Sequence, residues 1–393
     1  MATSAQSIRA YSGPPLFSFG FRPFFLFAAA WAALAVPIWV ASMTLGDGTV
    51  GGMDGRLWHI HGMLFGYLAG VIAGFLLAAV PNWTGRLPVT GRRLAALFGL
   101  WAAGRLAGFL PASLAVPAAV IDSAFLVVFA GVIWREVLAA KNRRNLPVCL
   151  LVSLLAAANI AFHLRGVWPV FGPGAERAAV AVITGLIALI GGRVTPSFTQ
   201  NWTTARGIKP GPTPFNRFDA GVLALTAVAL ASWVAAPWAA VTGGLMTLAG
   251  AANLARLARW RGWLARREPL VWILHLGYAW VGIGLILLGL AALVPAAVPF
   301  TAGVHALTAG AMGVETLAIM TRATRGHTGR PRVADRATTA IYLLILSAAV
   351  VRVCAPFHPE WNAPLLALSA TLWALAFAGF VAAYGPMLLR RSL

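Results

Sequence analysis

Charged residues are scarce in this sequence, and their scarcity excludes an ordinary soluble domain. They make up 10% of the 393 residues, whereas they form about a quarter of an average soluble domain. Hydrophobic residues make up 60% of the chain. This composition is typical of a protein embedded in a lipid bilayer.

Cysteine is almost absent. The two cysteines, Cys149 and Cys354, lie in apolar runs, and the chain contains no CxxC or CxxCH motif. A disulfide framework and a covalently attached c-type haem are therefore excluded. We expect both cysteines to be small buried hydrophobes.

Acidic residues are also few, with 10 Asp and Glu against 30 Lys and Arg, which gives a net charge of +20. Such an excess can indicate a nucleic-acid partner. Here, however, the basic residues fall in short loops between apolar runs. We therefore expect a lipid bilayer, and no nucleic acid, as the partner of this surface.

Long apolar runs are what the chain has in abundance. Each is close to the roughly 20 residues that a helix needs to cross the hydrocarbon core. They predict an all-α polytopic membrane protein with about 12 transmembrane helices in a single membrane domain, residues 1–393. The expected spans are 22–44, 58–81, 94–110, 113–138, 147–165, 177–200, 218–236, 238–257, 269–294, 299–321, 337–356 and 363–389.

The loops between these spans alternate in charge. The even-numbered loops are basic, and the odd-numbered loops contain almost no Lys or Arg. Because positive loops stay on the cytoplasmic side, this pattern predicts that both termini are cytoplasmic. The basic loops contain Arg86, Arg92 and Arg93; Arg135, Lys141, Arg143 and Arg144; Arg206, Lys209 and Arg217; Arg256, Arg259, Arg261, Arg266 and Arg267; and Arg325, Arg330, Arg332 and Arg336.

Short sequence matches suggest internal repeats. His61 and His305 are 244 positions apart, as are Gly66 and Gly310, and Asn82-Trp83-Thr84 recurs 119 positions later as Asn201-Trp202-Thr203. We interpret the chain as three parallel four-helix repeats, residues 16–140, 141–262 and 263–393. Four crossings preserve orientation, so equivalent residues would lie on the same side of the membrane.

Histidines are the first candidate site residues, because five of the seven fall in the expected outer half of the membrane or its outer loops. Histidine is the commonest metal ligand, and ionisable groups inside lipid suggest function by default. His61 and His305, equivalent in the proposed repeats, could supply two axial imidazoles to one haem. An alternative remains, since outer histidines also lie comfortably among lipid headgroups beside Trp.

Two further histidines are candidate ligands. His59 is two residues before His61, about 200° around a helix, so it would bind a second metal such as copper or donate a hydrogen bond to a ligand. His163 shares a helix face with Asn159, four residues earlier. His163 is a candidate metal ligand, and Asn159 a supporting hydrogen-bonding group.

Three charged residues inside the expected spans complete the candidate site. Arg105 and Arg352 lie near outer helix ends, where they could hold the carboxylates of haem propionates or extend to the headgroups. Glu315 lies in mid-helix and could carry protons or pair with a buried arginine. Asp122 is a second carboxylate within a span.

Three motifs carry a family resemblance. The opening Phe19-Gly20-Phe21-Arg22-Pro23-Phe24-Phe25-Leu26 resembles the N-terminal signature of the NnrS family. The segments 58–63 with 81–85, and 304–310 with 321–327, are similar to that family's helices. The resemblance implies a bacterial inner-membrane protein that contains haem and copper and belongs to the nitric oxide response.

Three functions compete at this point. The first is a nitric oxide reductase-like oxidoreductase that removes NO as nitrous oxide, using non-covalent haem b, copper, protons from Glu315 and electrons from a quinol or a small redox protein. The second is a non-catalytic haem or copper protein that binds NO. The third is a secondary transporter, whose site should lie near the midplane in broken helices. The outer grouping of histidines favours a cofactor over the transporter.

Overall fold

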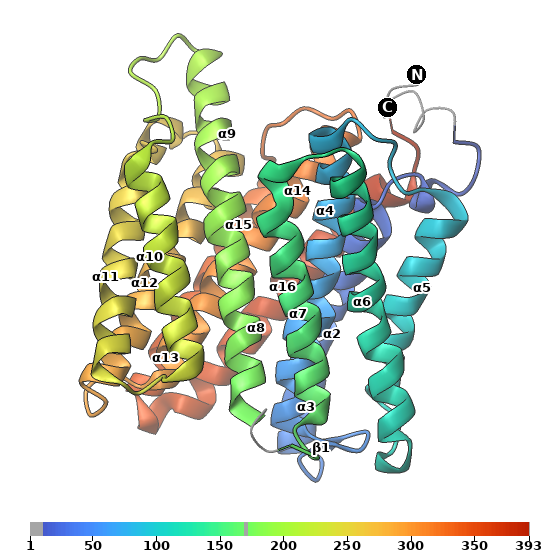
Figure 1. Ribbon diagram of the computed structural model, residues 1–393, viewed down its shortest axis with the longest axis vertical. Coiled ribbons are helices and arrows are strands. Elements are labelled where there is room, and N and C mark those ends of the chain that lie inside the picture. Colours follow the sequence, from blue (N-terminus) through green and yellow to red (C-terminus); the bar gives the residue numbers. More distant parts are fainter. Residues whose placement is uncertain (1–10, 169–171, 393) are drawn as a thin grey trace. The chain divides into compact units, whose positions relative to one another are not determined.

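The computed structural model describes residues 11–168 and 172–392, and these form twelve long helices (Figure 1). Nine of the twelve are continuous: α2 (Phe21–Thr44), α5 (Gly91–Ala107), α6 (Ala115–Ala139), α7 (Leu146–Leu164), α10 (Arg217–Ala235), α11 (Ala240–Ala258), α12 (Pro269–Leu293), α15 (Arg336–Cys354) and α16 (Asn362–Leu389).

The other three helices each contain a π-helical segment. They are α3–η2–α4 (Gly55–His61, Gly62–Leu68, Ala69–Thr84), α8–η6–α9 (Gly172–Leu186, Ile187–Gly191, Gly192–Thr204) and α13–η8–α14 (Phe300–His305, Ala306–Met312, Gly313–His327). Short 3₁₀ turns occur at η1 (Pro15–Phe17), η3 (Ala112–Leu114), η4 (Arg143–Asn145), η7 (Gly262–Ala265), η9 (Ala355–Phe357) and η10 (Pro359–Trp361). A small hairpin, β1 (Thr49–Val50) with β2 (Met53–Asp54), precedes α3.

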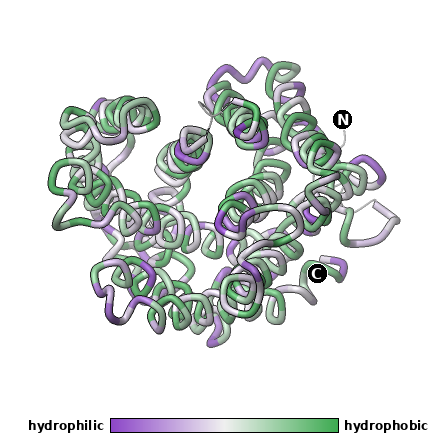
Figure 2. Tube along the Cα trace, turned by 90° about the horizontal axis from the view of Figure 1, so that it is seen from below, coloured by the Kyte–Doolittle hydropathy of each residue, from purple (hydrophilic) through white to green (hydrophobic). Residues whose placement is uncertain are grey.

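The described helices confirm the predicted all-α membrane fold. Ten of them are long and apolar enough to cross a membrane. The other two are α5, which has 17 residues, and α11, which carries the polar Asn253 and Arg256. Seen from below, the coils are coloured mainly as hydrophobic, and strongly hydrophilic stretches are short (Figure 2). Exposed apolar side chains such as Val116 and Val241 fit a lipid-facing surface.

The chain divides into two compact units. Unit 1 comprises Met1–Ala179, Arg322–Pro331 and Phe377–Leu393, and unit 2 comprises Val180–Thr321 and Arg332–Ala376. In unit 1, α2 packs on α4 and η2, while α6 packs on α4, α5 and α7. In unit 2, α12 packs on α11, α13, η8 and α15. Cys149 is buried as expected, whereas Cys354, at the end of α15, is exposed.

The N-terminal signature has a structural role in unit 1. Phe21, Phe24 and Phe25 are fully buried. Arg22 donates hydrogen bonds to the carbonyl oxygens of Leu388 at 2.9 Å and Arg390 at 2.6 Å. These carbonyls belong to the end of α16, where a helix lacks internal donors. Arg22 therefore caps the C-terminus of α16 from within the core.

Two of the three π-helical segments follow histidines that are predicted site residues. Segment η2 begins directly after His61 and η8 directly after His305, and each has 7 residues. Single π-helical turns occur preferentially at functional sites. The matched positions support the correspondence of these two segments, while the division into three repeats stays a prediction.

Gly66, in the middle of η2, lets side chains of the neighbouring helices α2 and α5 approach η2 closely. The indole Nε1 of Trp31 donates to the Gly62 carbonyl at 2.8 Å, and that of Trp101 donates to the Gly66 carbonyl at 2.9 Å. A Cβ atom on Gly66 would collide with the guanidinium group of Arg105 and approach Trp31 Nε1 to 2.9 Å. The absence of a side chain at Gly66 thus lets Arg105 lie beside the segment that follows His61.

Candidate metal centre

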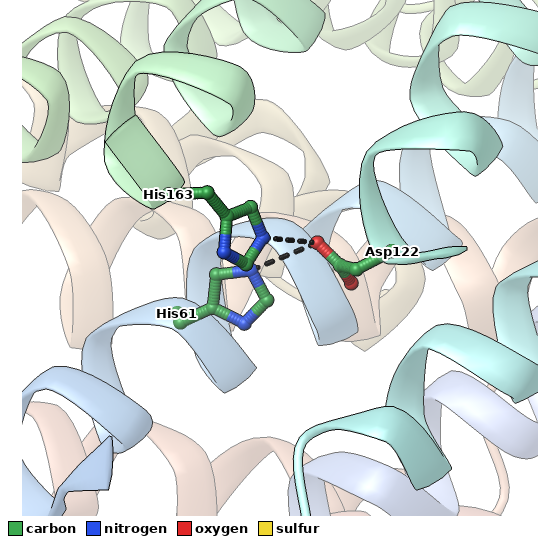
Figure 3. A group of neighbouring side chains, drawn as sticks. All are labelled: His61, Asp122 and His163. Atoms are coloured by element: carbon green, nitrogen blue, oxygen red, sulfur yellow. Dashed lines mark hydrogen bonds and ion pairs between the residues drawn. The ribbon is translucent and has the colours of Figure 1, made fainter. Parts of the chain in front are cut away.

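A buried polar cluster in unit 1 joins three helices (Figure 3). His61 ends α3, Asp122 lies in α6 and His163 lies near the end of α7. The Nε2 atoms of His61 and His163 are 2.9 Å and 3.0 Å from the same atom, Asp122 Oδ2. One possible ligand atom from each residue lies within 4.8 Å of the others. The cluster is thus compact enough for its three side chains to bind one ion.

Burial distinguishes this cluster from exposed polar groups. The exposed fractions of the side chains are 9% for His61, 3% for Asp122 and 14% for His163. The ring of Phe162 lies 5.0 Å from that of His61 between centroids. Because water has little access, interactions among these groups are stronger than at a surface.

Two more residues fix the orientation of the Asp122 carboxylate. Arg105, from α5, forms a buried ion pair with Asp122 Oδ1. Asn159, one turn before His163, donates from Nδ2 to Asp122 Oδ2 at 2.9 Å, and its Oδ1 is 3.1 Å from His61 Nε2. One carboxylate oxygen therefore faces the arginine, and the other faces the imidazoles.

Close packing of α5 on α6 makes this pairing possible. Gly104 precedes Arg105, and a Cβ atom on Gly104 would approach Asp122 Oδ1 to 2.9 Å. A larger residue at position 104 would push α6 away. On α7, the four-residue spacing of Asn159 and His163 places both on the face that meets α6.

The donor set fits a metal ion with a preference for nitrogen and oxygen ligands. Two imidazole nitrogens and one carboxylate oxygen suit zinc, copper and iron. Such ligands bind at about 2.0–2.2 Å, so donor atoms about 3 Å apart can share one ion in place of their hydrogen bonds. Arg105 would keep Oδ1, and the neutral imidazoles and Oδ2 would be the ligands.

His59, the other predicted site residue of α3, lies outside the group formed by His61, Asp122 and His163. His59 stacks on Trp39, with ring centroids 4.2 Å apart and planes 23° apart. His59 is not among the residues that form the group within ligand spacing. Its role as a ligand or donor stays a prediction. Arg105, expected to hold a propionate, is paired with Asp122, and a propionate would have to share it.

The other predicted residues lie in unit 2. His305 Nδ1 is 2.7 Å from the Thr301 carbonyl, which places the proton on Nδ1 and the lone pair on Nε2. Arg352, near the end of α15, is half-buried and has no hydrogen bond or ion pair with the described residues. Glu315 is buried, and its Oε1 has no hydrogen-bond partner among them.

The neighbourhoods of His305 and Arg352 meet. Helix α13 packs on α15, and Ala302 and Ala306, which flank His305, pack against Val353, the residue after Arg352. A half-buried arginine that has no acidic partner among the described residues can pair with an anionic group of a cofactor. Glu315 lies against Gly277 of α12, where a Cβ atom would approach its carboxyl carbon to 3.0 Å.

Asp122 is the site residue that the sequence did not assign. Two features of the sequence could have indicated Asp122: it is a carboxylate inside an apolar span, and the preceding span contains Arg105. The predicted pairing of Asn159 with His163 holds, since both contact Asp122. The contact with His61 depends on how α3, α6 and α7 pack together, which spacing alone does not reveal.

Fold and site together define a polytopic membrane protein with a buried His/Asp/His group that can hold a metal. The family profile described as "NnrS protein" matches residues 15–392, which is nearly the whole chain. The chain therefore belongs to the NnrS family, whose members are membrane proteins associated with the nitric oxide response. A comparison with curated protein sequences finds no match.

Proposed function

We propose that this protein removes nitric oxide by reducing it to nitrous oxide, and that its metal centre is the His61, Asp122 and His163 group. The single observation that carries the proposal is the convergence of these three side chains on one buried point. Ionisable groups in membrane spans are costly and suggest a function by default. Membership of the NnrS family supplies the link to nitric oxide.

The chain's own residues have separate tasks in this centre. His61 and His163 would hold the ion through Nε2, and Asp122 would hold it through Oδ2. Asn159 and Arg105 hold the carboxylate so that Oδ2 faces the ion. Copper is the ion that the family resemblance implies, and it suits imidazole ligands.

We assign haem b, the second implied cofactor, to unit 2. His305 would hold the haem, because the hydrogen bond to Thr301 orients its ring. Arg352 would hold a propionate, because the described chain offers it no acidic partner. Each of these metals, when bound, would supply redox chemistry for NO within its own unit. His61 Nε2 already faces Asp122, so we assign His61 to the ion.

The reaction consumes protons as well as electrons. Two NO, two electrons and two protons give one nitrous oxide and one water. Glu315 is the proton carrier we propose, since it is a buried carboxyl group within a candidate membrane span. The electrons come from a quinol or a small redox protein.

Anaerobic turnover tests the proposal. The purified protein, supplied with haem, copper and an excess of reductant, is mixed with NO while nitrous oxide is measured by gas chromatography. We expect one nitrous oxide for every two NO over many turnovers, and the same rate in His358→Ala, whose side chain is exposed. NO uptake that stops at one equivalent per metal would identify a non-catalytic binder. The absence of any NO uptake would favour a transporter.

A further inference from the structure

A basic pocket lies at one end of the helices of unit 1, and none of its lining residues belongs to the His61, Asp122 and His163 group. It is an open cavity of about 630 Å³, within the range of ligand pockets. Its walls come from the loop between α4 and α5, the start of α5 and the end of α6. The charged residues lining it are Arg86, Arg92, Arg93, Arg135 and Glu136.

Part of this charge is held rigidly. Glu136 is buried, and its Oε1 accepts hydrogen bonds from Arg135 Nε at 2.9 Å and Nη2 at 2.6 Å. Its Oε2 accepts from Arg86 Nε. The single carboxylate is thus shared by two arginines, which it fixes on the wall of the pocket. Both arginines keep part of their side chains exposed.

The other two arginines have no acidic partner among the described residues. Arg92 and Arg93 are exposed and lie in the first turn of α5. Thr90, the residue before this helix, makes no side-chain capping bond. Guanidinium groups and the N-terminal N–H groups of a helix both favour phosphate groups. Four arginines against one glutamate leave the pocket strongly cationic.

The position of the pocket identifies the source of the anion. One candidate membrane span ends at Thr84 and another at Ala139, so the pocket lies where two spans leave the membrane. A basic pocket at that depth meets the phosphate groups of lipids. Leu87, on its wall, and Leu138, near the end of α6, are exposed and apolar, as suits contact with acyl chains.

We propose that this pocket binds the phosphate headgroup of an anionic phospholipid, with Arg92 and Arg93 as the principal contacts. Arg86 and Arg135, fixed by Glu136, also line the pocket. The site is separate from the metal centre, and its occupancy does not depend on the reaction proposed above.

Native mass spectrometry of the full chain in detergent tests this site. The probes are phosphatidylglycerol and phosphatidylcholine with identical acyl chains. We expect phosphatidylglycerol to bind more tightly, and Arg92→Gln/Arg93→Gln to weaken it about 25-fold, since each basic residue near a membrane surface contributes about fivefold. The matched control is Arg143→Gln/Arg144→Gln, a tandem pair that is exposed but lies outside the pocket. It should change the affinity less than twofold.

Three results would overturn the proposal. Equal weakening by both arginine pairs would mean that only overall charge matters. Equal binding of the two lipids would exclude recognition of the anionic headgroup. Binding of inorganic phosphate alone as tightly as phosphatidylglycerol would make a free anion the ligand. Retention of haem and metal by both variants would show that each is folded.

Discussion

His61 and His305 are followed by the same backbone conformation, but the charged residues on the other helices of their units differ. Each histidine immediately precedes a seven-residue π-helix. Arg105 and Arg352 are 247 positions apart, and Asp122 has Ser369 at the same spacing. In unit 1, Arg105 pairs with Asp122. In unit 2, Ser369 donates to the Ala348 carbonyl at 2.9 Å, and Arg352 has no ion pair with the described residues.

The different residues at this spacing, Asp122 and Ser369, change what each unit can bind. A carboxylate beside Arg105 neutralises the arginine and presents its second oxygen to two imidazoles, as a metal ion requires. A serine in its place leaves Arg352 available to an anionic group. This difference supports our proposal of an ion in unit 1 and a propionate-bearing cofactor in unit 2.

The largest expected effect is the loss of one cofactor and not the other. His61→Ala should abolish binding of the ion and leave haem in place, because we assign His61 to the ion alone. His305→Ala should do the reverse. Metal analysis and the Soret absorbance of the purified variants measure both contents. Loss of haem in His61→Ala, with the ion retained, would reverse our assignment of the two sites.

Substitutions at Asp122 and Ser369 should lower the free energy of unfolding of the metal-free protein by different amounts. Asp122→Ala leaves the charge of Arg105 buried and unpaired, which should lower the free energy of unfolding by about 3–5 kcal/mol. Ser369→Ala removes one neutral hydrogen bond, worth about 1 kcal/mol. Denaturant titration in mixed micelles gives both values. Equal losses would mean that the Asp122–Arg105 pair does not distinguish unit 1.

Proton supply should depend on unit 2. Glu315 follows His305 by ten positions, and the equivalent position after His61 is the apolar Val71. Glu315→Gln should slow NO turnover by about 10²-fold, typical of a lost proton-transfer group, while haem and ion remain bound. The measurement is the initial rate of nitrous oxide formation. An unchanged rate would remove Glu315 from the mechanism.

The smallest expected effect concerns the orientation of Asp122. Asn159→Ala removes a hydrogen bond to the ligand carboxylate and should weaken metal binding by about 10–100-fold. Ser153→Ala is the control, because Ser153 lies on the same helix and contacts Trp134 instead. Competition with a chelator gives both affinities. Equal affinities in the two variants would show that Asn159 does not support the site.

The helices could be predicted from the sequence because each apolar run matches the thickness of a bilayer. The predicted span 58–81, for example, lies within the helical segment Gly55–Thr84. The π-helical segment η2 could not be predicted, since the indole groups of Trp31 and Trp101 reach its carbonyls from other helices. The candidate site was predicted in part: spacing joined Asn159 to His163, but only packing joins them to Asp122 and His61.

X-ray absorption spectroscopy of the copper-loaded protein tests the central claim most directly. Our account predicts an ion surrounded by two imidazole nitrogens and a carboxylate oxygen at about 2.0–2.2 Å, and the loss of this signal in His61→Ala/His163→Ala. A spectrum with sulfur ligands at about 2.3 Å, or one unchanged in the double variant, would place the metal elsewhere and contradict the account.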